Sequence, residues 1–134
     1  MATVLDEFTY TSFSVDAEIL NLSPHNWKQE LEEFKPCLLF VESAWFGHQK
    51  KWHKKISEFS PKINDLILWC KNLDIPTIFW CKEDPIHFDR FLETASHFDF
   101  VFTTDIESIP RYKAALRHSR IFYCHLLVNQ SFII

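Results

Sequence analysis

The chain has 134 residues, of which 47% are hydrophobic and 24% charged, and its formal net charge is −4. This mixture fits one globular domain and excludes a disordered chain, while the acidic balance argues against a nucleic-acid-binding protein. The sequence shows neither a signal-peptide pattern nor an apolar run near the roughly 20 residues of a membrane helix. We therefore expect a cytoplasmic protein.

Glycine and cysteine usage exclude further classes. A single glycine, Gly47, excludes a P-loop, which needs two, and a dinucleotide-binding fingerprint, which needs three. None of the cysteines forms a C-x-x-C pair, and we interpret them as reduced, buried thiols. The four cysteines are Cys37, Cys70, Cys81 and Cys124.

Short apolar runs alternate with helical patterns along the chain. The predicted strands cover residues 3–5, 18–22, 37–42, 77–81, 100–103 and 121–124. Several of these runs are continuously apolar, which is typical of parallel strands covered on both faces. The sequence predicts an α/β fold with a parallel sheet of about five to six strands and helices on both faces.

Paired capping residues and prolines predict the helix starts. A cap oxygen followed by proline at the first helical position occurs at Ser23-Pro24, Ser60-Pro61 and Asp84-Pro85. Apolar residues with helical spacing follow each pair. Ser108 is the predicted cap of a fourth helix that runs to about Arg117.

Residues 43–59 form a longer connection than the others. This segment carries Trp45, Phe46, Trp52, His48, His53 and four lysines. It reads either as a lid or binding loop or as a surface excursion with one irregular helical turn. Its lysines face solvent or form a basic patch for an anionic acceptor or for peripheral contact with a membrane surface. The spacing of the two histidines does not fit a metal site.

Carboxylates follow four of the predicted strands. Because carboxyl ends of parallel strands share one edge, we expect these side chains to gather there. The edge carries Asp6, Glu7, Glu42, Glu83, Asp84 and Asp105. It lacks the glycines of a diphosphate cradle, and it better suits a polyhydroxyl ligand, with Trp45 or Trp80 as an apolar face. A carboxylate or His87 is a candidate general base toward a hydroxyl group.

Structural roles compete with these functional ones. Asp84 is a candidate helix cap, His87 a residue of the first helical turn, and Asp105 a turn or cap residue, whereas Glu42 and Glu83 have no evident capping role. Cys81 ends an apolar run, and we interpret it as a buried thiol rather than a nucleophile.

An ordered series of segments runs through roughly residues 3–122: LDEF at 5–8, LFVESAW at 39–45, WCK at 69–71, IPTIFW at 75–80, KEDPIHF at 82–88, FDFVFTTD at 98–105 and IPRY at 109–112. In this series the chain resembles CgeB-like GT-B glycosyltransferases, bacterial enzymes associated with spore-surface and teichoic-acid-type cell-wall glycans. The resemblance implies a Rossmann-like N-terminal, acceptor-side domain over residues 1–124. It also implies that Glu42, Glu83, Asp84, His87, Asp105 and Arg111 face an interdomain cleft.

Two departures qualify the resemblance. The family is usually richer in small residues and glycine just after Trp45, where this chain reads FGHQK at 46–50, and the chain stops where the family continues into a nucleotide-sugar-binding domain. Residues 125–134 form an atypical tail that we interpret as the result of a truncation. The predicted catalytic candidates are Glu42, Glu83, Asp84 and His87, and the predicted substrate-binding residues are Asp6, Glu7, Trp45, Asp105 and Arg111.

We therefore expect an incomplete glycosyltransferase that transfers sugar from a nucleotide-sugar donor to a glycan or protein hydroxyl, without a metal or cofactor. The alternative is a non-catalytic α/β module that forms an oligomer or pairs with a separately encoded donor domain. A phosphoacceptor receiver domain is disfavoured because Glu42, and not an aspartate, ends the third strand.

Overall fold

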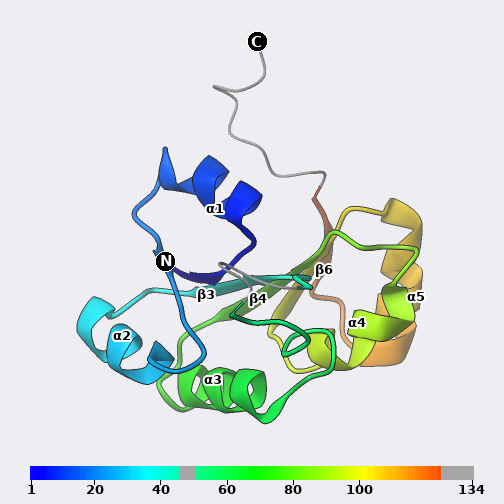
Figure 1. Ribbon diagram of the computed structural model, residues 1–134. Helices are drawn as coiled ribbons and strands as arrows, with labels where there is room; N and C mark the ends of the chain where they lie inside the picture. The colour runs from blue at the N-terminus through cyan, green and yellow to red at the C-terminus, as the bar shows by residue number, and fades with distance from the viewer. Residues whose placement is uncertain (46–50, 125–134) are drawn as a thin grey trace.

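The computed structural model describes residues 1–45 and 51–124, and a six-stranded parallel sheet lies at its centre (Figure 1). The strand order is β2-β1-β3-β4-β5-β6. The strands are β1 (Ala2–Val4), β2 (Leu20–Asn21), β3 (Leu39–Glu42), β4 (Thr77–Cys81), β5 (Phe100–Thr103) and β6 (Ile121–Tyr123). This is a Rossmann-like α/β fold, and it confirms the predicted class and the parallel pairing.

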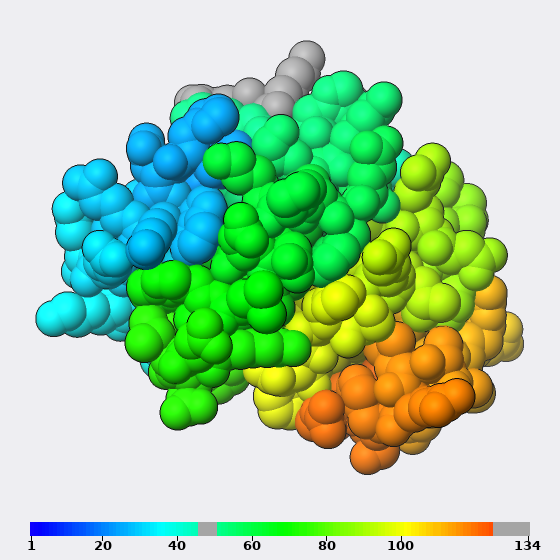
Figure 2. Space-filling view, turned by 90° about the horizontal axis from the view of Figure 1, so that it is seen from below, coloured from blue at the N-terminus to red at the C-terminus, as the bar shows by residue number. Residues whose placement is uncertain are grey.

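The helices cover the two faces of the sheet unequally. They are α1 (Glu7–Ser14), α2 (Trp27–Phe34), α3 (Pro61–Asn72), α4 (Phe88–Ala95) and α5 (Ile109–Leu116), the last preceded by the 3₁₀ turn η2 (Ile106–Ser108). Figure 2 shows α2, α3, α4 and α5 side by side over one face, whereas α1 lies on the other (Figure 1). Only the step from β1 to β2 runs against the direction of the others, so a right-handed crossover places α1 opposite the rest.

The hydrophobic core has two parts that match these faces. The larger part lies between the sheet and the four helices, and its buried members include Phe79, Ile63, Phe91 and Tyr112. The smaller part lies beneath α1 and is centred on Leu5, Phe40 and Trp80, with Tyr10, Phe13, Ile78 and Phe102 against it. A continuously apolar strand such as β3 therefore buries side chains on both faces.

Two of the predicted helix starts are confirmed, and two lie further along the chain. Helix α3 begins at Pro61 after Ser60, and α5 begins directly after Ser108. Helix α2 begins only at Trp27, although the Ser23 hydroxyl accepts the Asn26 N–H (3.2 Å) as a cap would. Ser23 also donates to the Glu30 carboxylate through its backbone N–H and its hydroxyl (3.1 and 2.8 Å). Helix α4 begins at Phe88, after a cis Asp84-Pro85 peptide bond, so the predicted start at Pro85 is wrong.

The sequence predicted no helix at the position of α1, and one of its two interpretations of residues 43–59, the surface excursion, is wrong for residues 51–59. Trp52 and Ile56 are fully buried in the larger core. The Trp52 indole N–H donates to the Leu22 carbonyl (2.9 Å), and the Thr94 hydroxyl donates to the Ile56 carbonyl (2.5 Å). The described part of the segment is therefore a packed element and not a surface excursion, while His48 and the tail at 125–134 lie outside the described residues.

Two further findings concern the apolar character of the helices and the state of the thiols. None of the helices within residues 1–45 and 51–124 has the length and apolar character needed to cross a membrane. The cysteines are free thiols, but only Cys70 and Cys81 are buried, so the prediction of burial is wrong for Cys37, which is exposed.

Candidate functional site at the carboxyl edge of the sheet

The parallel order brings the predicted carboxylates to one edge of the sheet. Strands β1, β3, β4 and β5 are neighbours, and Asp6, Glu42, Glu83 and Asp105 lie at or just after their carboxyl ends. The strand order changes direction between β1 and β3, which is where ligands bind in doubly wound sheets. The expected gathering of acidic residues is confirmed by this arrangement.

Glu42 lies at the centre of a buried polar cluster. Its side chain is 0% exposed. One carboxylate oxygen accepts the Asp6 backbone N–H at the start of α1, and the other accepts the Thr9 hydroxyl (2.9 Å). The Lys82 ammonium lies 3.0 Å from Glu42 and 3.3 Å from Asp6.

The electrostatics of this cluster follow from its burial. Burial raises the pKa of Glu42, and the Lys82 charge opposes that effect. Burial lowers the pKa of Lys82, but Glu42 and Asp6 outweigh it, and the pKa is raised overall. Sequence reasoning passed over Lys82, although a lysine directly after a strand beside several carboxylates is the signal that could have found it.

The position of Glu42 bears directly on its candidate role as a base. The carboxylate is enclosed between α1, β3 and β4, and its contacts with Asp6, Thr9 and Lys82 link these elements. A base must reach the proton that it abstracts, within about 3 Å. Glu42 joins α1 to the sheet, and its full burial keeps the carboxylate away from solvent.

Asp84 forms a second polar cluster instead of capping a helix. It accepts the Tyr112 hydroxyl (2.8 and 3.0 Å to its two oxygens) and the Thr103 hydroxyl (2.6 Å). The Cys81 thiol donates to the same carboxylate over 3.3 Å. These long-range partners explain why the capping prediction for Asp84 is wrong: the side chain joins β4, β5 and α5.

The groups around Asp84 stay protonated. Burial, followed by the charge of Asp84, raises the pKa of the Cys81 thiol to about 12. Burial likewise raises the pKa of the Tyr112 hydroxyl. A neutral thiol is a poor nucleophile, so the interpretation of Cys81 as a buried structural thiol holds.

Trp45 marks the more open part of the edge. Its half-buried ring meets His87 edge-on (centroids 5.0 Å apart) and also contacts Phe91 (5.1 Å). It lines a pocket of about 250 Å³ together with His53, Lys54, Ser57, Glu58 and Arg90. Trp80, the other candidate for an apolar face, is fully buried beneath α1, so that expectation is wrong.

The remaining predicted residues differ in accessibility. Glu83 is half-buried, and its carbonyl accepts the His87 N–H (2.9 Å), while Glu7 is exposed in the first turn of α1. Asp105 accepts the Ser108 hydroxyl (2.7 Å), which fits its predicted turn role. Arg111 lies against α4, with its guanidinium 3.8 Å from the Phe88 ring centre and 3.8 Å from the Asp89 carboxylate.

Sequence reasoning missed Arg90 as a pocket residue. It occupies a helical position with no motif around it, and only the packing of residues 51–59 against α4 brings it to Trp45.

Within the part of the chain that the structure describes, no group of three or more potential ligands could hold a metal ion. Compared with protein-family models, curated proteins and solved structures, the chain has no match in any of the three.

Proposed function

We propose that this chain is the acceptor-side domain of a glycosyltransferase and binds a glycan or another polyhydroxyl acceptor at the carboxyl edge of its sheet. The observation that carries the proposal is the pocket beside Trp45. An aromatic ring next to a few polar side chains is a common arrangement in small-molecule sites. Here Glu58 supplies acceptors, and Lys54 and Arg90 supply donors, for the hydroxyl groups of a sugar.

His87 is the residue that we assign as the candidate base. Glu42 is enclosed, and Asp84 is bonded to Tyr112 and Thr103, which leaves Glu83 and His87 as the more accessible catalytic candidates. In the transfer, an acceptor oxygen bonds to the sugar's anomeric carbon as the bond to the nucleotide diphosphate breaks, and the base takes the hydroxyl proton. The donor would be held by a separate domain.

Sugar binding can be measured by NMR with labelled tryptophan side chains. Hexoses, N-acetylhexosamines and polyol phosphates should shift the Trp45 indole signal saturably. Trp45→Phe should weaken binding by at least fivefold, whereas Trp69→Phe, a half-buried tryptophan on α3, should leave it unchanged. Equal effects of the two variants, or no shift with any sugar, would refute acceptor binding at this pocket.

A direct assay tests the role of the domain. The chain should show no turnover when it is supplied with a nucleotide sugar and cell-wall acceptors, because the proposal places the donor on another domain. Transfer by the isolated chain would contradict that division.

A second candidate function is a non-catalytic subunit that pairs with another protein. It is favoured by the face of the sheet opposite α3, where no helix of the described chain lies over β5 and β6 (Figure 1). Phe100 and Phe102 are half-buried there, and Phe122 is 47% exposed. Phe122→Ser should abolish any self-association seen by light scattering, and a monomeric wild-type chain would argue against pairing with a second copy.

A further inference from the structure

A second pocket lies at the opposite edge of the sheet from Trp45, and it is independent of the proposed function. It has a volume of about 390 Å³. Its lining comes from the end of α3, the turn before β4, the start of β5 and the residue before β6: Lys71, Asp74, Ile75, Pro76, Asp99, Phe100 and Arg120. This volume falls in the range of small-molecule sites.

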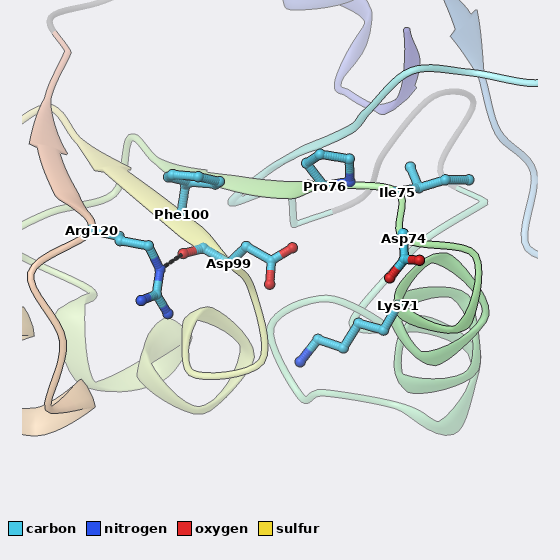
Figure 3. Close-up of a pocket in the computed structure, with 7 residues that line it drawn as sticks. All are labelled: Lys71, Asp74, Ile75, Pro76, Asp99, Phe100 and Arg120. Atoms are coloured by element: carbon cyan, nitrogen blue, oxygen red, sulfur yellow. Dashed lines mark hydrogen bonds between the residues drawn. The ribbon is translucent and has the colours of Figure 1, made fainter.

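Four charged side chains surround this pocket, and none of these described residues forms an ion pair with another of the four. Figure 3 shows Lys71 and Arg120 extending toward one side of the pocket, while the carboxylates of Asp74 and Asp99 lie nearer the strands. No ion pair links any of these four to another described residue. The pocket therefore offers two positive and two negative groups, and its net charge is close to zero.

Hydrogen bonds fix two of these groups in place. The Arg120 Nε–H donates to the Asp99 carbonyl (2.7 Å), which orients the guanidinium and leaves its terminal nitrogens toward the pocket (Figure 3). Asp99 Oδ2 accepts the Thr77 backbone N–H (3.0 Å) and hydroxyl (3.2 Å). Pre-oriented groups of this kind lose little conformational entropy when a ligand binds.

We propose that this pocket binds a small zwitterion with an apolar body, such as a free amino acid with an aromatic side chain. The ligand carboxylate lies between Lys71 and Arg120, and its ammonium group faces Asp74 and Asp99. Phe100 and Pro76 supply the apolar wall. A polyanion is disfavoured because the two aspartates would repel it.

Three probes of one shape test this assignment by NMR titration of backbone amides. L-Phenylalanine carries both charges, 3-phenylpropanoate only the negative charge, and phenethylamine only the positive charge. We expect L-phenylalanine to bind saturably, with shifts at residues 71–76, 99–100 and 120, and at least tenfold more tightly than either analogue. Equal binding of 3-phenylpropanoate would overturn the zwitterion assignment, and no binding of L-phenylalanine would overturn the site.

Matched variants separate the two halves of the pocket. Lys71→Gln should weaken L-phenylalanine at least fivefold, while Arg117→Gln, an exposed arginine outside the lining, should not change it. Asp74→Asn should weaken L-phenylalanine without weakening 3-phenylpropanoate. Unchanged affinity in either pocket variant would overturn the assignment. None of these results depends on sugar binding at Trp45.

Discussion

The Lys82 ammonium lies 3.0 Å from the enclosed carboxylate of Glu42, and this contact joins β4 to β3 at the carboxyl edge of the sheet. Through Glu42 the contact extends to the backbone of Asp6 and the hydroxyl of Thr9, where α1 begins. Helix α1 is short and rich in threonine and serine, so its sequence alone stabilises it weakly. We infer that the pair holds α1 against the sheet.

Lys82→Met should therefore lower the free energy of unfolding by about 3 kcal/mol at pH 7, because it leaves a buried carboxylate without its cation. The Lys82 side chain is 21% exposed, which places the effect at the low end for buried pairs. Urea unfolding followed by tryptophan fluorescence measures the change. The double variant with Glu42→Gln should recover most of the loss.

The difference in free energy of unfolding between the wild-type chain and the Lys82→Met variant should also depend on pH. Burial already raises the pKa of Glu42 above its ordinary value, and loss of Lys82 raises it further. The folded variant then takes up a proton at a higher pH than the unfolded chain does, so its stability improves as the pH falls toward 4.5. A deficit that stays constant from pH 7 to pH 4.5 would show that the loss is one of packing and not of charge.

The sequence predicted the strands well because they combine two strong signals. Continuous apolar runs identify strands covered on both faces, and the short helical connections require these strands to be parallel. The parallel order was enough to predict that Asp6, Glu42, Glu83 and Asp105 lie at one edge of the sheet. It could not show which of them stays accessible, because the accessibility of Glu42 depends on α1 and on Lys82, which follows β4.

The missed features depend on contacts between distant residues. Asp84 has the local pattern of a helix cap, but its carboxylate accepts hydrogen bonds from the hydroxyl groups of Tyr112 and Thr103 instead. Trp52 stands in a segment with no clear period, and its burial depends on the Leu22 carbonyl and on the other residues of the larger core. Local patterns contain no information about such partners.

Trp52→Phe tests whether residues 51–59 are part of the core. The change removes the indole hydrogen bond to Leu22 and leaves a gap, and we expect it to lower the free energy of unfolding by about 2 kcal/mol. Trp27→Phe is the control, because Trp27 is only half-buried and should cost less than about 1 kcal/mol. Similar losses in chemical denaturation for the two variants would mean that the segment packs only loosely.

Two helix ends carry strain because the chain has almost no glycine. The residues that directly follow α2 and α5 are Lys35 (φ 51°) and Arg117 (φ 59°), and both lie in the left-handed region. This region disfavours residues with a Cβ atom, so Lys35→Gly and Arg117→Gly should each raise the free energy of unfolding by about 0.5–1 kcal/mol. Glu32→Gly, inside α2, should instead lower it by about 1 kcal/mol. Thermal unfolding distinguishes these signs, and destabilisation by both end variants would contradict the argument.

Alkaline conditions should destabilise the protein from about pH 9 upward. Burial is the main cause that raises the pKa of Cys70 and of Cys81 to about 12, from an ordinary value of 9.0. The folded chain keeps these protons while the unfolded chain releases them, so stability is complete below pH 9 and falls between pH 9 and pH 12. Each thiol makes the free energy of unfolding fall with pH by at most about 1.4 kcal/mol per pH unit.

Denaturant unfolding under reducing conditions between pH 8 and pH 10 measures this slope before Tyr112 and Lys82 add to it. A variant with both buried cysteines changed to alanine should show a clearly smaller slope, whereas Cys37→Ala, at an exposed position, should keep the wild-type slope. Equal slopes in all three proteins would assign the alkaline loss to other groups.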